Sequence, residues 1–114
     1  MRVYGIFGIK ESAINELIEN HIKTFTIINA YNLETLKNLK EGDFIFITST
    51  LKQDLRNGSE GVLCKVLEVS IIPQIITGFE EKEVIAGRLK VEMLGFAKCS
   101  ITNSEFIEIR FRTF

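Results

Sequence analysis

The sequence predicts an α+β fold in which a small, partly closed antiparallel β-barrel carries two or three short helices. Runs rich in β-branched and aromatic residues recur along all 114 residues, and short stretches with helical spacing separate some of them. The run over residues 44–50 is apolar on both faces, as in a strand covered on both sides. The run over residues 61–72 is long for one strand and changes its apolar face, which predicts a bend.

Length and composition predict a single globular domain over residues 1–114. Hydrophobic residues make up 46% of the chain and charged residues 25%, so we expect a packed core rather than disorder. No apolar run approaches the roughly 20 residues of a membrane-spanning helix, and the N-terminus lacks the apolar segment of a signal peptide. We therefore expect a cytoplasmic protein with no membrane partner. A net charge of −1 argues against a strongly basic nucleic-acid surface.

The first half of the chain predicts two strands and two helices. Residues 2–9 have strand composition, and Ser12 is the expected N-cap of a helix over residues 12–21. Residues 23–28 are rich in β-branched side chains and predict a short strand. Asn29 or Asn32 then caps a second short helix, whose leucines recur at helical spacing.

The second half predicts four more strands. The interior strand over residues 44–50 and the bent strand over residues 61–72 flank a polar loop, and Pro73 is expected to end or interrupt the bent strand. Residues 80–86 predict one or two helical turns, ended by Gly87.

Two further runs, over residues 88–101 and 105–113, alternate apolar and polar side chains as half-buried strands do. Asn103 and Ser104 between them predict a turn. The whole chain is then expected to hold six strands and two or three short helices.

Few residues have the chemistry of a metal or cofactor site. Cys64 and Cys99 both fall within strand-like runs, so we expect two reduced, buried thiols rather than a metal site. His21, the single histidine, falls at a helix end, where it meets the negative end of the helix dipole. There is no glycine-rich phosphate loop, no Ser-His-Asp set and no zinc knuckle, and we expect no cofactor and no metal.

The order of elements resembles the PUA-like superfamily, and within it the ASCH domains. The resemblance rests on the opening helix, the strand Lys23-Thr24-Phe25-Thr26, the turn Glu41-Gly42-Asp43 and the bent strand that ends near Ser70. The chain also resembles an uncharacterised family of small archaeal proteins of similar length. Two positions depart from the ASCH pattern, because His21-Ile22 replaces the usual glycine before the lysine and Ile28 replaces a common arginine.

The resemblance implies that Lys23 lines a cleft, with Thr24 and Thr26 on the same strand. It favours a small binding module for RNA or a modified nucleotide. The residues expected to bind are Lys23, Thr24, Thr50, Lys52 and Arg56. Contacts from lysine and arginine to phosphate would make such binding depend on salt.

Two other functions remain open from the sequence. One ASCH branch hydrolyses acylated cytidines, which implies a catalytic set of Lys23, Thr26 and Glu81, with Glu80 or Glu83 as alternative acids. The other is a protein-interaction module or homodimer, because Phe96, Phe106 and Phe114 fall on otherwise polar faces.

Overall fold

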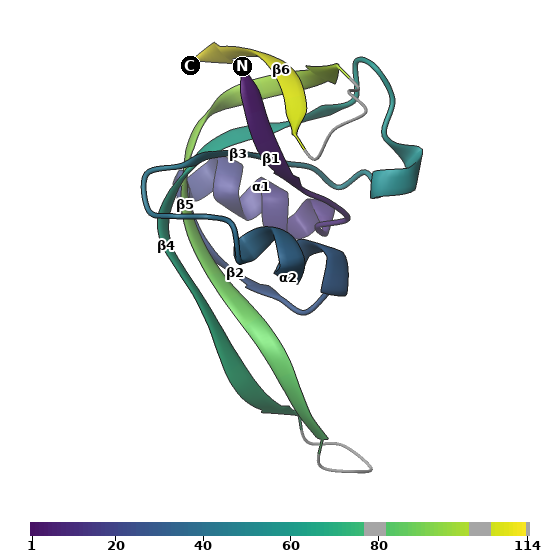
Figure 1. The fold of residues 1–114 in the computed structure, drawn as a ribbon. Coiled ribbons are helices and arrows are strands. Elements are labelled where there is room, and N and C mark those ends of the chain that lie inside the picture. The colour runs from purple at the N-terminus through teal and green to yellow at the C-terminus, as the bar shows by residue number, and fades with distance from the viewer. Residues whose placement is uncertain (77–81, 101–105, 114) are drawn as a thin grey trace.

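The computed structural model describes residues 1–76, 82–100 and 106–113, and these form six strands, two α-helices and one 3-10 helix (Figure 1). In chain order the elements are β1 (Arg2–Ile6), α1 (Glu11–Asn20), β2 (Ile22–Ile27), α2 (Ala30–Leu36), β3 (Phe44–Ile47), the 3-10 helix η1 (Lys52–Asp54), β4 (Glu60–Ile76), β5 (Lys82–Ser100) and β6 (Ile107–Thr113). The predicted mixed α+β class is confirmed.

The six strands form one sheet whose pairings close into a ring. The strand order is β2-β5-β4-β3-β1-β6, and β5 also pairs with β6, so β5, β4, β3, β1 and β6 complete the ring. β2 lies outside the ring, against β5. The prediction of an all-antiparallel sheet is wrong at one place, because β1 and β3 pair in parallel, from Tyr4 opposite Ile45 to Ile6 opposite Ile47. The long connection through α1, β2 and α2 allows this parallel pairing.

β4 bends as the sequence predicts. Its register against β5 shifts between Leu63 and Cys64 and again between Val66 and Glu68, and each shift adds local curvature. From the pair of Ile72 and Ala86 onward, where β2 no longer pairs with β5, β4 and β5 continue as a two-stranded ribbon that extends away from both helices (Figure 1).

Two predictions about this ribbon are wrong. Pro73 does not end β4, because it lies opposite Ile85 within the pairing. The expected helix over residues 80–86 is a strand from residue 82 onward, since Lys82–Ser100 pairs with β4. A helix of one or two turns is marginal alone, and pairing with β4 satisfies the same backbone groups. Glu80, Glu81 and the predicted turn at residues 103–104 lie outside the described residues.

The helix ends follow their local sequence in part. The N-cap of α1 is Lys10 and not the predicted Ser12, which lies inside the helix. His21 is the C-cap, with φ of 67°, which confirms the prediction of a helix-end histidine. Asn29 caps α2, because its side chain accepts a hydrogen bond of 3.1 Å from the Asn32 backbone N–H.

β3 separates two hydrophobic clusters, which confirms that this strand is covered on both sides. Ile45 and Ile47 belong to the cluster under the two helices, whereas Phe46 belongs to a cluster drawn from the strands of the ring. Cys64 lies in the first cluster and Cys99 in the second, both buried and reduced. The prediction that Cys64 and Cys99 are buried thiols outside a disulfide is therefore confirmed.

Candidate functional site

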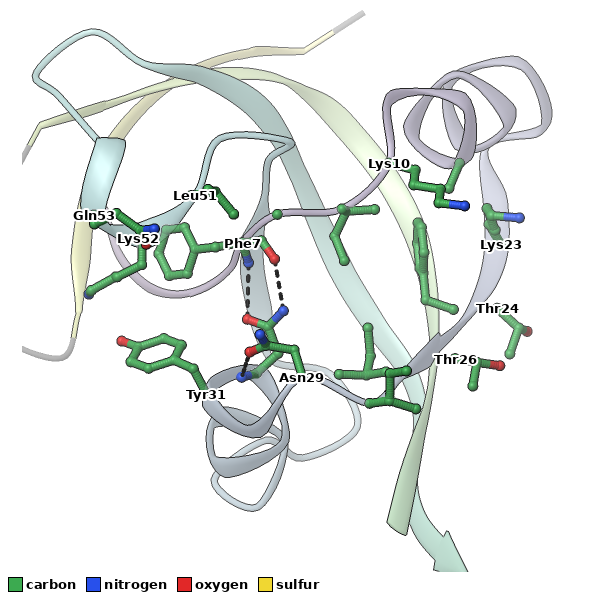
Figure 2. Close-up of a pocket in the computed structure, with 17 residues that line it drawn as sticks. Phe7, Lys10, Lys23, Thr24, Thr26, Asn29, Tyr31, Leu51, Lys52 and Gln53 are labelled. Atoms are coloured by element: carbon green, nitrogen blue, oxygen red, sulfur yellow. Dashed lines mark hydrogen bonds between the residues drawn. The ribbon is translucent and has the colours of Figure 1, made fainter. Parts of the chain in front are cut away.

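A pocket of about 660 Å³ opens between β2 and the beginnings of the three helical segments (Figure 2). Its walls are residues 7–10, Ala13 of α1, residues 23–29, Tyr31 and Asn32 of α2, and residues 51–53. This volume is within the range of small-molecule sites, about 300–1,000 Å³. The pocket is therefore the candidate binding site of the molecule.

Asn32 holds one wall of the pocket in place. Its side-chain oxygen accepts a hydrogen bond of 3.1 Å from the Phe7 backbone N–H, and its side-chain nitrogen donates one of 2.8 Å to the Phe7 carbonyl. Asn32 is 3% exposed, so both hydrogen bonds form away from water. They fix α2 to the end of β1, and so fix the Phe7 ring at the pocket wall.

A second set of hydrogen bonds joins the loop after β3 to the same wall. The Gly8 N–H donates to the Thr50 carbonyl at 3.0 Å, and the Ile9 N–H donates to the Thr48 carbonyl at 3.2 Å. The buried Thr48 hydroxyl donates to the Glu60 carbonyl at 2.8 Å and accepts from the Thr50 N–H at 3.2 Å. The loop that carries η1 is therefore tied to the pocket through its backbone.

Among the described residues that line the pocket, three are lysines and none is acidic. Lys10 and Lys23 lie at one end of the pocket, and Lys52 lies at the other (Figure 2). Within residues 1–76, 82–100 and 106–113, no ion pair forms at Lys10 or Lys52. The pocket thus presents positive charge at both ends of a largely apolar wall, an arrangement suited to an anionic ligand.

Lys23 is the lysine that the sequence predicted, and it has a partner that the sequence did not indicate. Its Nζ lies 2.6 Å from Glu16 Oε2 and 5.6 Å from the centroid of the Phe25 ring. Glu16 belongs to α1, not to the region of residues 80–83 from which an acid was expected. The carboxylate beside Lys23 thus comes from the helix that precedes β2 in the chain.

Lys52 lies against two aromatic rings. Its Nζ is 5.1 Å from the Phe7 ring centroid and 5.2 Å from the Tyr31 ring centroid. The two rings are 5.9 Å apart and inclined by 59°. The distances from the Lys52 Nζ to the two ring centroids are those of cation–π contacts. We call Phe7, Tyr31 and Lys52 the aromatic corner.

The other residues that were predicted to bind contribute less directly to the pocket. Thr24 and Thr26 border the pocket, but their side chains are exposed and point away from the aromatic corner (Figure 2). Thr50 and Arg56 are not among the lining residues, although Thr50 supports the wall through its backbone. Glu81 lies outside the described residues, so the predicted convergence of Lys23, Thr26 and Glu81 stays a prediction.

Sequence reasoning missed Lys10, Glu16, Phe7 and Tyr31. Each lies within or beside a segment that was interpreted only as secondary structure. The available signal for Tyr31 was its position between two asparagines. Asn29 caps α2, and Asn32 lies in the first turn of that helix.

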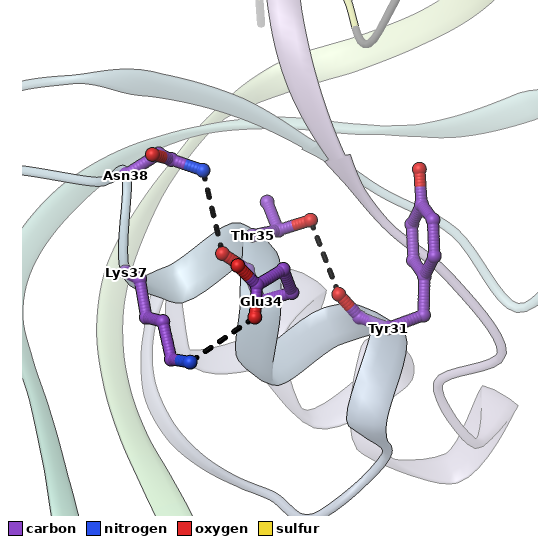
Figure 3. A network of polar contacts seen from close by, with 5 residues as sticks. All are labelled: Tyr31, Glu34, Thr35, Lys37 and Asn38. Atoms are coloured by element: carbon purple, nitrogen blue, oxygen red, sulfur yellow. Dashed lines mark hydrogen bonds and ion pairs between the residues drawn. The ribbon is translucent and has the colours of Figure 1, made fainter.

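Polar contacts along α2 hold the helix that carries Tyr31 (Figure 3). The Thr35 hydroxyl donates to the Tyr31 carbonyl at 3.4 Å, and Asn38 Nδ2 donates to the Glu34 carbonyl at 3.4 Å. Lys37 pairs with Glu34 at 3.1 Å, three residues apart on the exposed face. These contacts stabilise a helix of only seven residues and therefore the position of Tyr31.

The two thiols are poor nucleophiles. Burial raises the pKa of the Cys64 thiol far above its ordinary value, and it raises the pKa of the Cys99 thiol as well. The Cys99 thiol also donates a hydrogen bond of 3.2 Å to the Arg56 carbonyl. Neither thiol has the lowered pKa of a reactive cysteine.

The described residues contain neither a metal-binding cluster nor a membrane-spanning helix. No group of three or more His, Cys, Asp or Glu side chains there is arranged to hold a metal ion. No helix among the same residues has both the length and the apolar character needed to cross a membrane.

Comparisons with known proteins identify relatives that are themselves uncharacterised. Residues 1–111 match the family model described as "Protein of unknown function (DUF473)". The chain is 68% identical over 114 residues to "Uncharacterized protein MJ0105" of Methanocaldococcus jannaschii, and the match covers 100% of this chain and 75% of that protein. No solved structure matches the chain.

Proposed function

Since the chain belongs to the DUF473 family of proteins of unknown function, we propose from its pocket that it binds a nucleotide, either free or as part of an RNA. The observation that carries this proposal is the combination of lysines and aromatic rings around one pocket. A nucleotide has an anionic phosphate and a planar ring, and the pocket provides groups that bind each of them.

Charge supports the phosphate part of the proposal. Lys10 and Lys23 lie at the same end of the pocket (Figure 2), and only Lys23 is paired with a carboxylate. Hydrogen bonds between lysine and phosphate are charge-assisted and stronger than neutral ones. A phosphate at this end would then be bound mainly by Lys10, with Lys23 contributing to the extent that Glu16 is displaced.

Volume supports a ligand of nucleotide size. A pocket of about 660 Å³ encloses one nucleotide but not a folded RNA segment. An RNA ligand would therefore insert one nucleotide and leave the rest of its chain on the surface. The exposed Thr24 and Thr26 on the outer side of β2 are candidates for contacts with that remainder.

The same proposal includes a PUA-like fold of the ASCH type. The closed ring of β5, β4, β3, β1 and β6, with two helices packed beside it, supports this assignment. A measured structure of any family member, compared with PUA-like domains, would test it directly.

Titration of the protein with the four ribonucleoside 5′-monophosphates and with short single-stranded RNA tests the proposal. We expect binding that weakens as salt is raised, because phosphate contacts depend on salt. Lys10→Ala should weaken binding by about tenfold, the effect of one charge-assisted hydrogen bond, and Lys23→Met should weaken it by less, because Lys23 is paired with Glu16. The exposed Lys65, on β4 outside the pocket, provides the control variant Lys65→Ala. Absence of binding by any of these ligands at high micromolar protein and low salt would overturn the proposal.

A hydrolase of acylated nucleosides is the second proposal for the same pocket. The close pair of Lys23 and Glu16, at 2.6 Å, supports it because it places a basic and an acidic group together at the wall. Release of free cytidine from acylated cytidine, lost in Lys23→Met, is the expected result. If the purified protein binds nucleotides but releases no cytidine, the result supports the proposal of a binding module and contradicts the proposal of a hydrolase.

Self-association is the remaining proposal about partners. Phe96 is 50% exposed, which suits an interface, whereas Phe106 packs on the Tyr4 ring at 4.5 Å. Phe114 lies outside the described residues. Sedimentation over a range of protein concentrations tests this proposal, and a single monomeric species throughout would contradict it.

A further inference from the structure

We propose that Lys52 occupies, in the free protein, the position that the planar ring of the ligand takes when it binds. This inference rests on the proposed nucleotide-binding function and assigns the two parts of the ligand to the two ends of the pocket. The base stacks at the aromatic corner, and the displaced ammonium of Lys52 turns toward the phosphate.

The geometry of the aromatic corner carries the inference. The Lys52 ammonium lies almost equally far from both rings, 5.1 Å from Phe7 and 5.2 Å from Tyr31. Tyr31 is 45% exposed, so one side of its ring is open to a ligand once the lysine moves away. Phe7 is 6% exposed and forms the floor of the corner.

The backbone at both aromatic residues is held by hydrogen bonds, whereas the contacts of the Lys52 ammonium within the described residues are those with the Phe7 and Tyr31 rings. Phe7 is fixed by the two hydrogen bonds to Asn32, and Tyr31 lies in the first turn of α2, which Asn29 caps. In the described part of the chain, Lys52 forms no ion pair that would keep its ammonium in place. The lysine can therefore leave while the rings stay.

The relative strengths of the two contacts favour replacement of the Lys52 ammonium by a nucleobase. A cation–π contact at an exposed site is weak, and a nucleobase stacked on an aromatic side chain interacts more strongly. The displaced ammonium also gains a charge-assisted contact if the ligand carries a phosphate. A nucleoside without phosphate gains the stacking but not the second contact, so the two ligands should respond differently to loss of Lys52.

Binding of matched ligands to Lys52→Ala tests this difference. The ligands are the tightest-binding ribonucleoside 5′-monophosphate, its nucleoside and ribose 5-phosphate. We expect Lys52→Ala to bind the nucleoside about threefold more tightly, because the corner is already empty. The same variant should bind the monophosphate about threefold more weakly, because the roughly tenfold loss of a phosphate contact exceeds the threefold gain from the empty corner. A change of the same sign for both ligands would overturn the inference.

Variants of Tyr31 provide an independent readout. Tyr31→Leu should weaken the nucleoside and the monophosphate about tenfold while leaving ribose 5-phosphate unchanged, since only the ring is lost. Tyr31→Phe keeps the ring and should bind like the unaltered protein. Equal affinity of Tyr31→Leu and Tyr31→Phe for the monophosphate would exclude a ring site at this corner.

Nuclear magnetic resonance reports the position of Lys52 directly. In the free protein the ε-methylene protons of Lys52 should be shifted upfield by the two rings. This shift should decrease in Tyr31→Leu, which keeps only the Phe7 ring, and should disappear on saturation with the monophosphate. An upfield shift that persists at saturation would show that Lys52 stays in the corner, and this would overturn the inference while the binding proposal stands. If no nucleotide binds to the unaltered protein, the binding proposal and this inference fail together.

Discussion

Glu16 of α1 and Lys23 of β2 form an ion pair of 2.6 Å at the wall of the pocket. The side chain of Lys23 is 22% exposed and that of Glu16 is 59% exposed, so solvent screens the pair on its outer side. Pairs of this kind contribute at most about 1 kcal/mol to folding. The larger effect of this ion pair is on the charge of the pocket, because Glu16 neutralises the ammonium of Lys23.

The first prediction follows from this competition. Glu16→Gln should increase the affinity for a nucleoside monophosphate about threefold, because Lys23 no longer pairs with a carboxylate and becomes available to the phosphate. Calorimetric titration at low salt measures the change. Glu19→Gln, on an exposed position of the same helix, is the matched control and should leave the affinity unchanged. An unchanged or lower affinity in Glu16→Gln would show that the pair does not compete with the ligand.

The second prediction concerns the buried amide of Asn32. Asn32→Ala removes both hydrogen bonds to the Phe7 backbone and leaves a buried N–H and a buried carbonyl without partners. We expect the free energy of unfolding to fall by about 2–4 kcal/mol, measured by urea denaturation. Asn38→Ala, on an exposed residue with a hydrogen bond of 3.4 Å, should change it by less than about 0.5 kcal/mol. Similar losses in the two variants would contradict a special role for the buried amide.

The sequence predicts the centre of this fold well because burial leaves a clear periodic signal there. Ile45, Phe46 and Ile47 are all fully buried, and a run that is apolar on both faces predicts such a strand. The bend of β4 was also predictable, since its buried face changes sides where the register shifts. Each of these patterns is visible in a few consecutive residues and does not depend on contacts with distant segments.

The remaining errors come from contacts between distant segments. Parallel pairing of β1 with β3 depends on how the chain returns after α2, and no residue in either strand indicates direction. Residues 82–86 have helical composition but pair with β4, so tertiary pairing overrides local propensity. The aromatic corner likewise joins residues 7, 31 and 52, which lie in three separate segments of the chain. The family resemblance therefore pointed to Lys23, and neither the resemblance nor local spacing pointed to its carboxylate partner or to the rings.

The third prediction compares two glycines in β4 and β5. A Cβ added at Gly61 would lie 2.6 Å from the backbone carbonyl oxygen of Ile47 and 2.5 Å from the Phe46 ring, neither of which can yield easily. A Cβ at Gly87 would come closest to the ends of two flexible side chains, those of Leu36 and, at 3.2 Å, Leu33, and would lie in ordinary contact with the Ile27 Cβ at 3.7 Å. We expect Gly61→Ala to destabilise the protein by about 2–3 kcal/mol and Gly87→Ala by about 1 kcal/mol.

Thermal and urea denaturation of the two glycine variants, measured under one set of conditions, gives the comparison. The order of the two losses is the informative result. If Gly87→Ala proves the more harmful variant, packing of the Leu36 and Leu33 side chains is more rigid than the structure indicates.

The last prediction concerns alkaline pH and the thiol of Cys64. Burial raises its pKa in the folded protein well above the ordinary value of 9.0, so the folded state keeps this proton at pH values where the unfolded state loses it. The contribution to stability is therefore complete below pH 9 and is lost as pH rises beyond that value. The expected loss from this group is about 1.4 kcal/mol per pH unit.

Urea denaturation of the unaltered protein and of Cys64→Ala at several pH values between about 8 and 10.5 tests this titration. Removal of the side chain lowers stability at every pH because it leaves a cavity, so the comparison uses the slope with pH and not the absolute value. We expect the free energy of unfolding to fall less steeply with pH in Cys64→Ala. The thiol of Cys99 is present in both proteins. Its contribution to the slope of the unfolding free energy with pH therefore cancels when the two slopes are subtracted, provided that the two thiols titrate independently. Identical slopes would show that Cys64 ionises as easily in the folded protein as in the unfolded chain, which is incompatible with its complete burial beneath the helices.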